Sequence, residues 1–247
     1  MINVAVLGAA GRMGSHVVQA VGAADDMEVV ATLDADDDIA AAAHAKAEVV
    51  VDFTVPDSTE AHVHALIDLG LHAVVGTTGW TSDALARVEE HLKERPDLGV
   101  LIAPNFAIGA VLAMRFAAVA APYFESAEVV ELHHPDKVDA PSGTAIHTAR
   151  GIAAARADAG LEPSPDATTH DPHGARGADI DGVHVHAVRL RGLVAHEEVL
   201  FGNAGEAFTI RTDSFDRASF MPGVLLGIRE VASRPGLTVG LDRYMDL

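Results

Sequence analysis

The 247-residue chain contains no cysteine, and this absence excludes several classes of protein. Disulfide frameworks, thiolate zinc centres and cysteine-held iron–sulfur clusters all require the missing thiols. A cysteine-free chain suits a reducing compartment, so we expect a cytoplasmic protein.

Positive charge and long apolar runs are also scarce. Lysine and arginine total 17 against 36 acidic residues, a formal net charge of −19. Nucleic-acid binders usually present a basic face, so nucleic acid is not an expected partner. No run approaches the roughly 20 apolar residues of a membrane span, and the start lacks the basic region of a signal peptide, so no membrane contact is expected. With 49% hydrophobic residues, the chain is globular.

The chain begins with an apolar run at 2–7, a glycine turn, a helical pattern ending at Gly22, and a second apolar run closed by Asp34. In this order the elements predict dinucleotide binding. The glycines permit a tight turn, the helix N-terminus offers N–H groups to a pyrophosphate, and Asp34 can accept hydrogen bonds from a ribose. The spacing is G-x-x-G-x-x-G instead of the usual G-x-G-x-x-G, so a glycine turn without a ligand stays an alternative.

Three more apolar runs, at 47–53, 71–75 and 99–102, alternate with helical patterns. This alternation predicts a parallel sheet covered on both faces, with ligands bound at the carboxyl ends of its strands. The segments expected at that edge are Gly8 to Gly14, Asp34, Gly76 to Gly79 and Ala103 to Phe106.

The rhythm changes after Phe106. An apolar helix, a strand at 127–132 and an alanine-rich helix are followed by a long loop at 162–182. Three glycine-separated extended segments, 183–191, 194–201 and 207–213, are predicted to form antiparallel hairpins, and a last helix is predicted to begin at Ser214. The fold class is therefore an α/β Rossmann-type parallel-sheet domain plus an α+β domain with a mostly antiparallel sheet.

The stretch from Glu131 to Ala145 concentrates reactive side chains between a strand and a helix. Lys137 can attract a carboxylate or donate a proton, and His133 can position or exchange one. Ser142-Gly143-Thr144 at a helix start can cradle a carboxylate. These groups suit hydride addition to a small, anionic, unsaturated substrate.

The same stretch fits the signature Glu-x-His-His-x-x-Lys-x-Asp-x-Pro-Ser-Gly-Thr-Ala, through which the chain resembles the 4-hydroxy-tetrahydrodipicolinate reductase (dihydrodipicolinate reductase) family. Ala-Pro-Asn-Phe at 103–106 resembles the actinobacterial members. The resemblance covers essentially the whole chain, with supporting motifs at Gly8 to Gly14, Val51 to Thr54, Gly76 to Gly79, Phe208 to Asp213 and Arg217 to Gly223.

The resemblance implies NAD(P)H-dependent reduction of a cyclic imine dicarboxylate, with loss of water, in the diaminopimelate route to lysine. It implies a dinucleotide-binding domain at 1–106, completed by about 216–247, and a substrate-binding and tetramerisation domain at 107–215, hence a homotetramer. His133 and Lys137 are the implied acid/base pair, and His134, Gly143 and Thr144 the implied substrate ligands. The implied cofactor-binding residues are Gly8, Ala9, Ala10, Gly11, Arg12, Met13, Asp34, Gly76, Thr77, Thr78, Ala103, Pro104, Asn105 and Phe106.

One departure from the family pattern concerns the cofactor. Members that favour NADPH tend to carry an arginine beside the acid that ends the second strand, whereas Ala35 follows Asp34 here and three further aspartates come next. They would repel a 2′-phosphate, so we predict that NADH is preferred, with some NADPH use assisted by Arg12. Some relatives also carry a lysine where this chain has Ala10.

Three alternatives remain: another two-domain NAD-dependent amino-acid dehydrogenase, a non-catalytic NAD-binding sensor, and a metal site. The metal site lacks an HExxH spacing, so no metal is expected; its candidate ligands are His133, His134, His147, His170 and His173. Trp80 is interpreted as a packing residue. Arg189, Arg191 and Arg211 are interpreted as interface or surface charges.

Overall fold

The computed structural model describes residues 1–245 and divides the chain into two compact units. The first unit comprises Met1–Ala107 together with the C-terminal segment from Arg217, and the second comprises Ile108–Asp216. The last two residues of the segment expected to complete the nucleotide domain, 246 and 247, lie outside the described part of the chain. No helix within residues 1–245 combines the length and the apolar character that crossing a membrane requires.

The first unit is built on a six-stranded, fully parallel sheet with strand order β11-β5-β4-β3-β1-β2. Its central strands are almost wholly buried, as a parallel sheet with both faces covered requires. The strands are β1 (Ile2–Leu7), β2 (Met27–Leu33), β3 (Val49–Asp52), β4 (His72–Val75), β5 (Gly99–Ile102) and β11 (Gly236–Val239).

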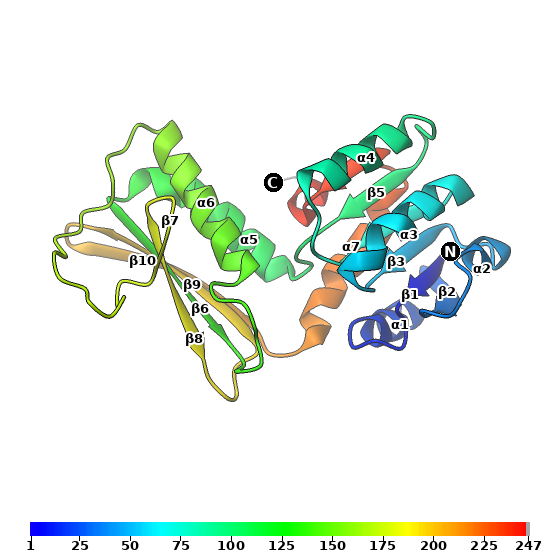
Figure 1. Ribbon diagram of the computed structural model, residues 1–247, viewed down its shortest axis with the longest axis horizontal. Coiled ribbons are helices and arrows are strands. Elements are labelled where there is room, and N and C mark those ends of the chain that lie inside the picture. Colours follow the sequence, from blue (N-terminus) through cyan, green and yellow to red (C-terminus); the bar gives the residue numbers. More distant parts are fainter. Residues whose placement is uncertain (246–247) are drawn as a thin grey trace. The chain divides into compact units, whose positions relative to one another are not determined.

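Helices cover both faces of this sheet, with α3 and α4 packed together on one face and α1 and α7 on the other (Figure 1). The sequence determines where they begin: Pro56 occupies the first turn of α3, and the Thr81 hydroxyl caps α4 by accepting the Ala84 N–H. The helices are α1 (Gly14–Gly22), α2 (Ala40–His44), α3 (Pro56–Leu69), α4 (Ser82–Leu92) and α7 (Met221–Val231), with short 3-10 turns η2 (Arg217–Phe220) and η3 (Leu241–Tyr244).

The second unit contains a five-stranded sheet of order β10-β9-β6-β8-β7, and α5 and α6 pack against one of its faces (Figure 1). Alternate residues of β6, such as Val129, are buried under these helices. The elements are α5 (Ile108–Ala120), η1 (Ala121–Tyr123), β6 (Ser126–His133), α6 (Gly143–Asp158), β7 (Ala178–Ile180), β8 (Val183–Arg189), β9 (Ala195–Asn203) and β10 (Glu206–Ser214).

Two expectations about the later elements were wrong. Only β9 and β10 form a hairpin among the three predicted segments, because β6 lies between β8 and β9 and pairs with β8 in parallel. The last α-helix begins at Met221 instead of Ser214, since β10 extends to Ser214 and η2 intervenes. The parallel β6–β8 pair has a consequence for the site, because it places Arg189 beside His133.

Candidate active site

A pocket of about 720 Å³ opens at the carboxyl ends of β1, β2, β3 and β4. Its volume lies in the range usual for small-ligand and cofactor sites, roughly 300–1,000 Å³. Ala9, Ala10 and the segment 103–106 do not line it. The sequence-predicted cofactor residues that do are Gly8, Gly11, Arg12, Met13, Asp34, Gly76, Thr77 and Thr78.

The glycine turn has the backbone that a dinucleotide requires. Gly8 has φ +75°, and a Cβ there would stand 2.8 Å from the Phe53 carbonyl oxygen. A Cβ at Gly14 would lie 2.0 Å from the Gly8 carbonyl oxygen, so only glycine lets α1 begin this close to the turn. No side chain caps the start of α1 and its first turn holds no acid, so the positive helix end suits a pyrophosphate. The residues present therefore fit a nicotinamide dinucleotide.

Two aspartates line the pocket just after β2. Both carboxylate oxygens of Asp34 accept the Ala10 N–H, at 3.1 and 3.2 Å, which ties the end of β2 to the glycine turn. Asp37 accepts the Asp34 N–H at 2.8 Å. Among the described residues, Arg12 is the pocket's single lysine or arginine. The pocket is therefore acidic on the side of β2.

A buried carboxylate, Asp52, joins the segments that surround the pocket. It ends β3, is 0% exposed, and accepts the Thr54 N–H and hydroxyl at 2.8 and 2.6 Å. The hydroxyls of Thr59 and Thr77 donate to it at 3.1 and 3.2 Å, and His62 Nδ1 lies 3.2 Å away. Burial alone would raise the pKa of Asp52, but hydrogen bonds from His62 and Thr54 hold that pKa below its ordinary value. An ionised Asp52 thus fixes the loops after β3 and β4.

The segment 103–106 lies outside the pocket lining and packs against a residue of that lining. Asn105 Oδ1 accepts the Ala107 N–H at 2.8 Å, and Phe106 is buried with its ring centroid 5.8 Å from that of Phe53. Because Phe53 lines the pocket, the segment acts on it through this ring contact. Trp80 is a packing residue as expected: it packs on the hydrophobic core, and its indole N–H donates to the Thr77 carbonyl at 3.0 Å.

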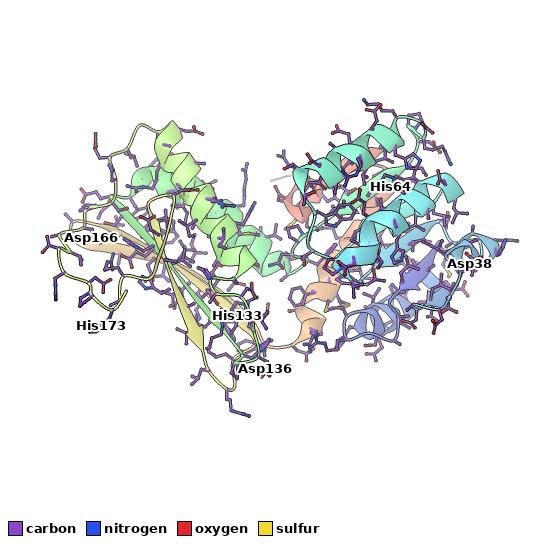
Figure 2. The ribbon with its side chains drawn as sticks, viewed as in Figure 1. Asp38, His64, His133, Asp136, Asp166 and His173 are labelled. Atoms are coloured by element: carbon purple, nitrogen blue, oxygen red, sulfur yellow. The ribbon has the colours of Figure 1, made fainter. Side chains whose placement is uncertain are left out.

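In the second unit, His133 ends β6 and Asp136 follows in the next loop (Figure 2). Two residues earlier on the same strand face, Glu131 is 0% exposed, with Oε2 2.5 Å from His133 Nδ1. Arg189 donates to both carboxylate oxygens of Glu131, at 2.7 and 2.8 Å, and the Ser142 N–H donates to Oε1 at 3.2 Å. A buried carboxylate thus binds an imidazole, a guanidinium and the residue that caps α6.

The cluster has a definite charge state. Burial would raise the pKa of Glu131, but hydrogen bonds from Arg189 and His133 bring it below the ordinary value, so Glu131 is ionised. Burial is the main cause that lowers the pKa of His133, and the nearby charge of Lys137 adds to this effect, while the Glu131 hydrogen bond opposes it. A neutral His133 with Nδ1–H donated to Glu131 leaves its Nε2 lone pair for proton exchange.

The first turn of α6, at Gly143 and Thr144, could hold an anion, and we call these two residues the carboxylate cradle. Ser142 Oγ accepts the Ala145 N–H at 3.2 Å, which caps the helix. A Cβ built on Gly143 would meet nothing within 4 Å, so open space borders the first turn. Gly143 and Thr144 therefore present the positive end of a 16-residue helix to a space that could receive an anion.

Lys137 lies in the loop between His133 and this cradle. Its Nζ donates to Asp139 at 2.7 Å, and this hydrogen bond is the main cause that lowers the pKa of Asp139. Its backbone N–H donates to the His134 carbonyl at 3.3 Å. The strand end, the loop and the helix start thus carry all the residues predicted for proton transfer and substrate binding.

Sequence reasoning missed part of this cluster. Arg189 was interpreted as an interface or surface charge, but its guanidinium binds the buried Glu131, to which no role was assigned. An acidic residue inside an apolar strand was the available signal, since a buried charge needs a partner. Within residues 1–245, no group of three or more histidine or acidic side chains is placed to hold a metal ion.

The first unit is a Rossmann-type nucleotide-binding domain, and the second carries groups for proton transfer and anion binding; together they define a two-unit nucleotide-dependent reductase. Residues 2–106 match the family model "Dihydrodipicolinate reductase, N-terminus", and residues 109–245 match "Dihydrodipicolinate reductase, C-terminus". The chain belongs to the dihydrodipicolinate reductase family.

Individual relatives agree with the family models. The 4-hydroxy-tetrahydrodipicolinate reductase of Beutenbergia cavernae is 70% identical over 246 residues, which cover 100% of this chain and 99% of the relative. That of Streptomyces coelicolor is 59% identical, with 100% and 98% covered. The solved structure of a dipicolinate-bound dihydrodipicolinate reductase from Paenisporosarcina sp. TG-14 has a TM-score of 0.89 and 38% identity over 98% of this chain and 99% of its own.

These findings confirm the predicted family, including its actinobacterial character, and the predicted fold class. The chain is an enzyme, and a Rossmann-type domain in a reductase of this family implies NAD(P)H as the reductant. An engineered D-amino acid dehydrogenase shares the fold alone, with a TM-score of 0.54 and 14% identity over 98% of this chain and 93% of its own. The amino-acid dehydrogenase alternative therefore keeps no support beyond the shared fold.

Proposed function

We propose that the protein reduces 4-hydroxy-tetrahydrodipicolinate to tetrahydrodipicolinate in the diaminopimelate route to lysine. Water is lost from the hydroxylated ring, which gives up its hydroxyl and a ring hydrogen, and a hydride from NAD(P)H and a proton then add across a ring double bond. The observation that carries this proposal is the 70% identity to the Beutenbergia cavernae reductase over 100% of the chain. The Paenisporosarcina reductase binds dipicolinate in its solved structure, and this supports a cyclic dicarboxylate as the substrate class.

His134, Gly143 and Thr144 bind the substrate carboxylates in this proposal. The uncrowded first turn of α6 supports the role of Gly143 and Thr144, because helix N-termini favour anions and a side chain at 143 would occupy the adjoining space. Lys137, in the loop before this turn, adds a positive charge that attracts a dianion. The local positive groups offset a chain whose formal net charge is −19.

His133 and Lys137 form the proposed acid/base pair. The Glu131 carboxylate fixes the imidazole so that Nε2 exchanges the proton, and Arg189 holds that carboxylate in place. Lys137 then donates the proton to the ring as the double bond is reduced. Its contact with Asp139 keeps the ammonium group in the loop before the substrate binds.

The nicotinamide dinucleotide, when bound, supplies the hydride from its C4 position. We assign the pyrophosphate to Gly8, Ala9, Ala10, Gly11, Arg12 and Met13, and the adenine ribose to Asp34. Gly76, Thr77, Thr78 and the segment 103–106 serve the nicotinamide side. Asp34 and Asp37 line the pocket where a 2′-phosphate would add negative charge, which supports a preference for NADH over NADPH.

We further propose that the second unit assembles a homotetramer through its sheet. The helices α5 and α6 pack on one face, and alternation along β6 and β9 turns Val130 and Leu200 to the opposite face. Leu200 is 39% exposed there, which is unusual for a leucine in a central strand and suits burial against a second copy.

A biosynthetic reductase that draws on NAD(P)H also fits a cytoplasmic location.

The proposed activity is tested by following NADH oxidation with enzymatically generated 4-hydroxy-tetrahydrodipicolinate. We expect turnover that depends on this substrate, with tetrahydrodipicolinate and one equivalent of NAD⁺ as products. Tight NADH binding without any turnover would instead favour the non-catalytic sensor. The mass of the protein in solution, measured by light scattering, tests the tetramer separately.

A further inference from the structure

A second glutamate lies beside the Glu131 cluster, and the proposed chemistry does not use it. Glu197 in β9 is paired with Glu131 across the antiparallel β6–β9 ladder, so the two side chains share the face that α6 covers. Glu131 is 0% exposed and Glu197 is 5% exposed. Two carboxylates thus lie side by side beneath the helix whose start forms the proposed carboxylate cradle.

The contacts of Glu197 differ from those of Glu131. Its Oε1 lies 2.7 Å from the Thr148 hydroxyl, and the same hydroxyl lies 3.1 Å from the Thr144 carbonyl. Its Oε2 is buried and has no hydrogen-bond partner among the described residues. No arginine, lysine or histidine bonds to Glu197 in that part of the chain, whereas Glu131 has Arg189 and His133.

These contacts favour a protonated Glu197. A hydroxyl has a single hydrogen and cannot donate fully to two acceptors, but Thr148 can donate to the Thr144 carbonyl if Glu197 Oε1–H donates to Thr148. A neutral acid also leaves an uncharged oxygen at the unpartnered position, which costs less than a buried, unpaired charge. The contacts therefore fit two successive hydrogen bonds, in which the Glu197 carboxyl donates to Thr148 and the Thr148 hydroxyl donates to the Thr144 carbonyl.

The charges that face Glu197 agree with this assignment. Glu131 on β6 is the neighbouring anion, and the nearby cation, Arg189 on β8, is bonded to Glu131, as is His133. On β10 the residue opposite Glu197 is the neutral Thr212, which Gly109 of α5 approaches. The pKa of Glu197 is raised to about 7, mainly by burial; the Thr148 hydrogen bond lowers it and the charge of Glu131 raises it, and both effects are included in that value.

Arg156 on α6 is buried, but its guanidinium donates to the backbone carbonyls of Phe124, Glu125 and Glu162. His147 and Arg150 on α6 are exposed, as is Arg115 on α5. Glu198, the next residue on β9, lies on the opposite face of the sheet and accepts from Arg211 at 2.8 Å. Glu131 is therefore the charge that Glu197 meets directly.

We propose that Glu197 is a positioning residue whose bound proton keeps a second negative charge away from the carboxylate cradle at Gly143 and Thr144. This inference rests on the proposed function, which assigns the cradle to the substrate. When Glu197 ionises, Thr148 turns its hydrogen toward the new carboxylate and the Thr144 carbonyl loses that donor. The added charge under the first turns of α6 also opposes the positive helix end, so a dianionic substrate binds more weakly.

The test is the pH dependence of the substrate KM in the whole enzyme, with Glu197→Gln as the variant and Glu198→Gln as the matched control. From about pH 6 to about pH 8.5 we expect the wild-type KM to rise roughly fivefold, while kcat changes less than about twofold. Glu197→Gln should keep the low KM throughout, because the amide cannot ionise, and Glu198→Gln should follow the wild type.

A second measurement reports the proton without using activity. The infrared carbonyl band of a protonated carboxyl should be present in the wild type near pH 6, fade as the pH passes about 7, and be absent from Glu197→Gln. A wild type without turnover at any pH would contradict the proposed function. An active wild type whose KM is flat, a variant that keeps the wild-type rise, or no titrating carboxyl band would overturn the role of Glu197.

Discussion

Each unit buries a carboxylate in the last residues of a strand, and the two carboxylates receive hydrogen bonds from different kinds of donor. Asp52 in the nucleotide unit receives threonine hydroxyls, a backbone N–H and His62. Glu131 in the second unit receives Arg189 through both oxygens, together with His133 and the Ser142 N–H. Both are 0% exposed, and hydrogen bonds lower the pKa of each from its ordinary value.

The difference indicates what each carboxylate does. The donors to Asp52 come from separate segments after β3 and β4, so this carboxylate mainly holds loops in shape around the pocket. The donors to Glu131 include a guanidinium and a histidine that can carry a proton, so this carboxylate mainly sets charge and ring orientation. Changes near Glu131 should alter chemistry, and changes near Asp52 should alter cofactor binding.

The largest expected effect is on the side of Glu131. Lys137→Ala removes the proposed proton donor, and kcat should fall by about 10² to 10⁴ because general acid catalysis contributes that much. NADH affinity, measured by fluorescence titration, should stay within about twofold, since Lys137 lies on the second unit. Lys93→Ala is the control, because that lysine is 66% exposed and pairs with Glu90 on the surface of the first unit. A kcat within about threefold of the wild type would exclude Lys137 as the donor.

The next effect combines stability with catalysis. Glu131→Gln leaves the Arg189 guanidinium largely buried without a carboxylate, so the free energy of unfolding should drop by about 3–5 kcal/mol. The turnover number should fall as well, because His133 loses the acceptor that orients its ring. Urea unfolding and kcat are the two measurements.

A second substitution separates these two losses. Arg189→Met in the Glu131→Gln background removes the uncompensated charge and should recover part of the stability, but not the turnover. If turnover returned together with stability, the loss would be one of folding and His133 orientation would not be involved.

Asp52→Asn probes the other carboxylate, with a smaller expected effect. Asparagine keeps one acceptor oxygen for the threonine hydroxyls, so the free energy of unfolding should fall by about 1–3 kcal/mol. The loops that line the pocket loosen, so the KM for NADH should rise while kcat changes little. Asp25→Asn, an exposed position in the same unit, is the control. A large loss of kcat with normal NADH binding would break the contrast between the two carboxylates.

The comparison of Asp52 with Glu131 also shows which parts of the fold and of the site could be predicted from the sequence. The strand and glycine patterns are local, so the parallel sheet and most of the residues around its pocket were predictable from residue order. The donors to Asp52 come from positions as distant as Thr77, and no local pattern pairs them. Placing Arg189 beside His133 required the register of a parallel β6–β8 pair, which alternation alone does not determine. The strand β11 was missed because its four residues carry little signal without β5 beside them.

The smallest expected effect is at the edge of the nucleotide pocket, because solvent screens the exposed charges there. Asp34 and Asp37 line the pocket and Ala35 stands between them, so kcat/KM should favour NADH over NADPH in the wild type. Ala35→Arg should raise kcat/KM for NADPH about tenfold, because a guanidinium–phosphate hydrogen bond contributes roughly 1.5–3 kcal/mol and solvent at this exposed position screens part of it.

Ala35→Gln is the matched control for this change, since it adds a long polar side chain without charge and should leave NADPH use nearly unaltered. The gain from Ala35→Arg should also shrink as salt is added, because exposed charges are screened within about 10 Å at 0.1 M ionic strength. Charge within the buried Glu131 cluster is screened far less, so Glu131→Gln should cost nearly the same at low and high salt. An NADPH preference in the wild type, or an equal gain from arginine and glutamine, would show that Asp34 and Asp37 do not set cofactor choice.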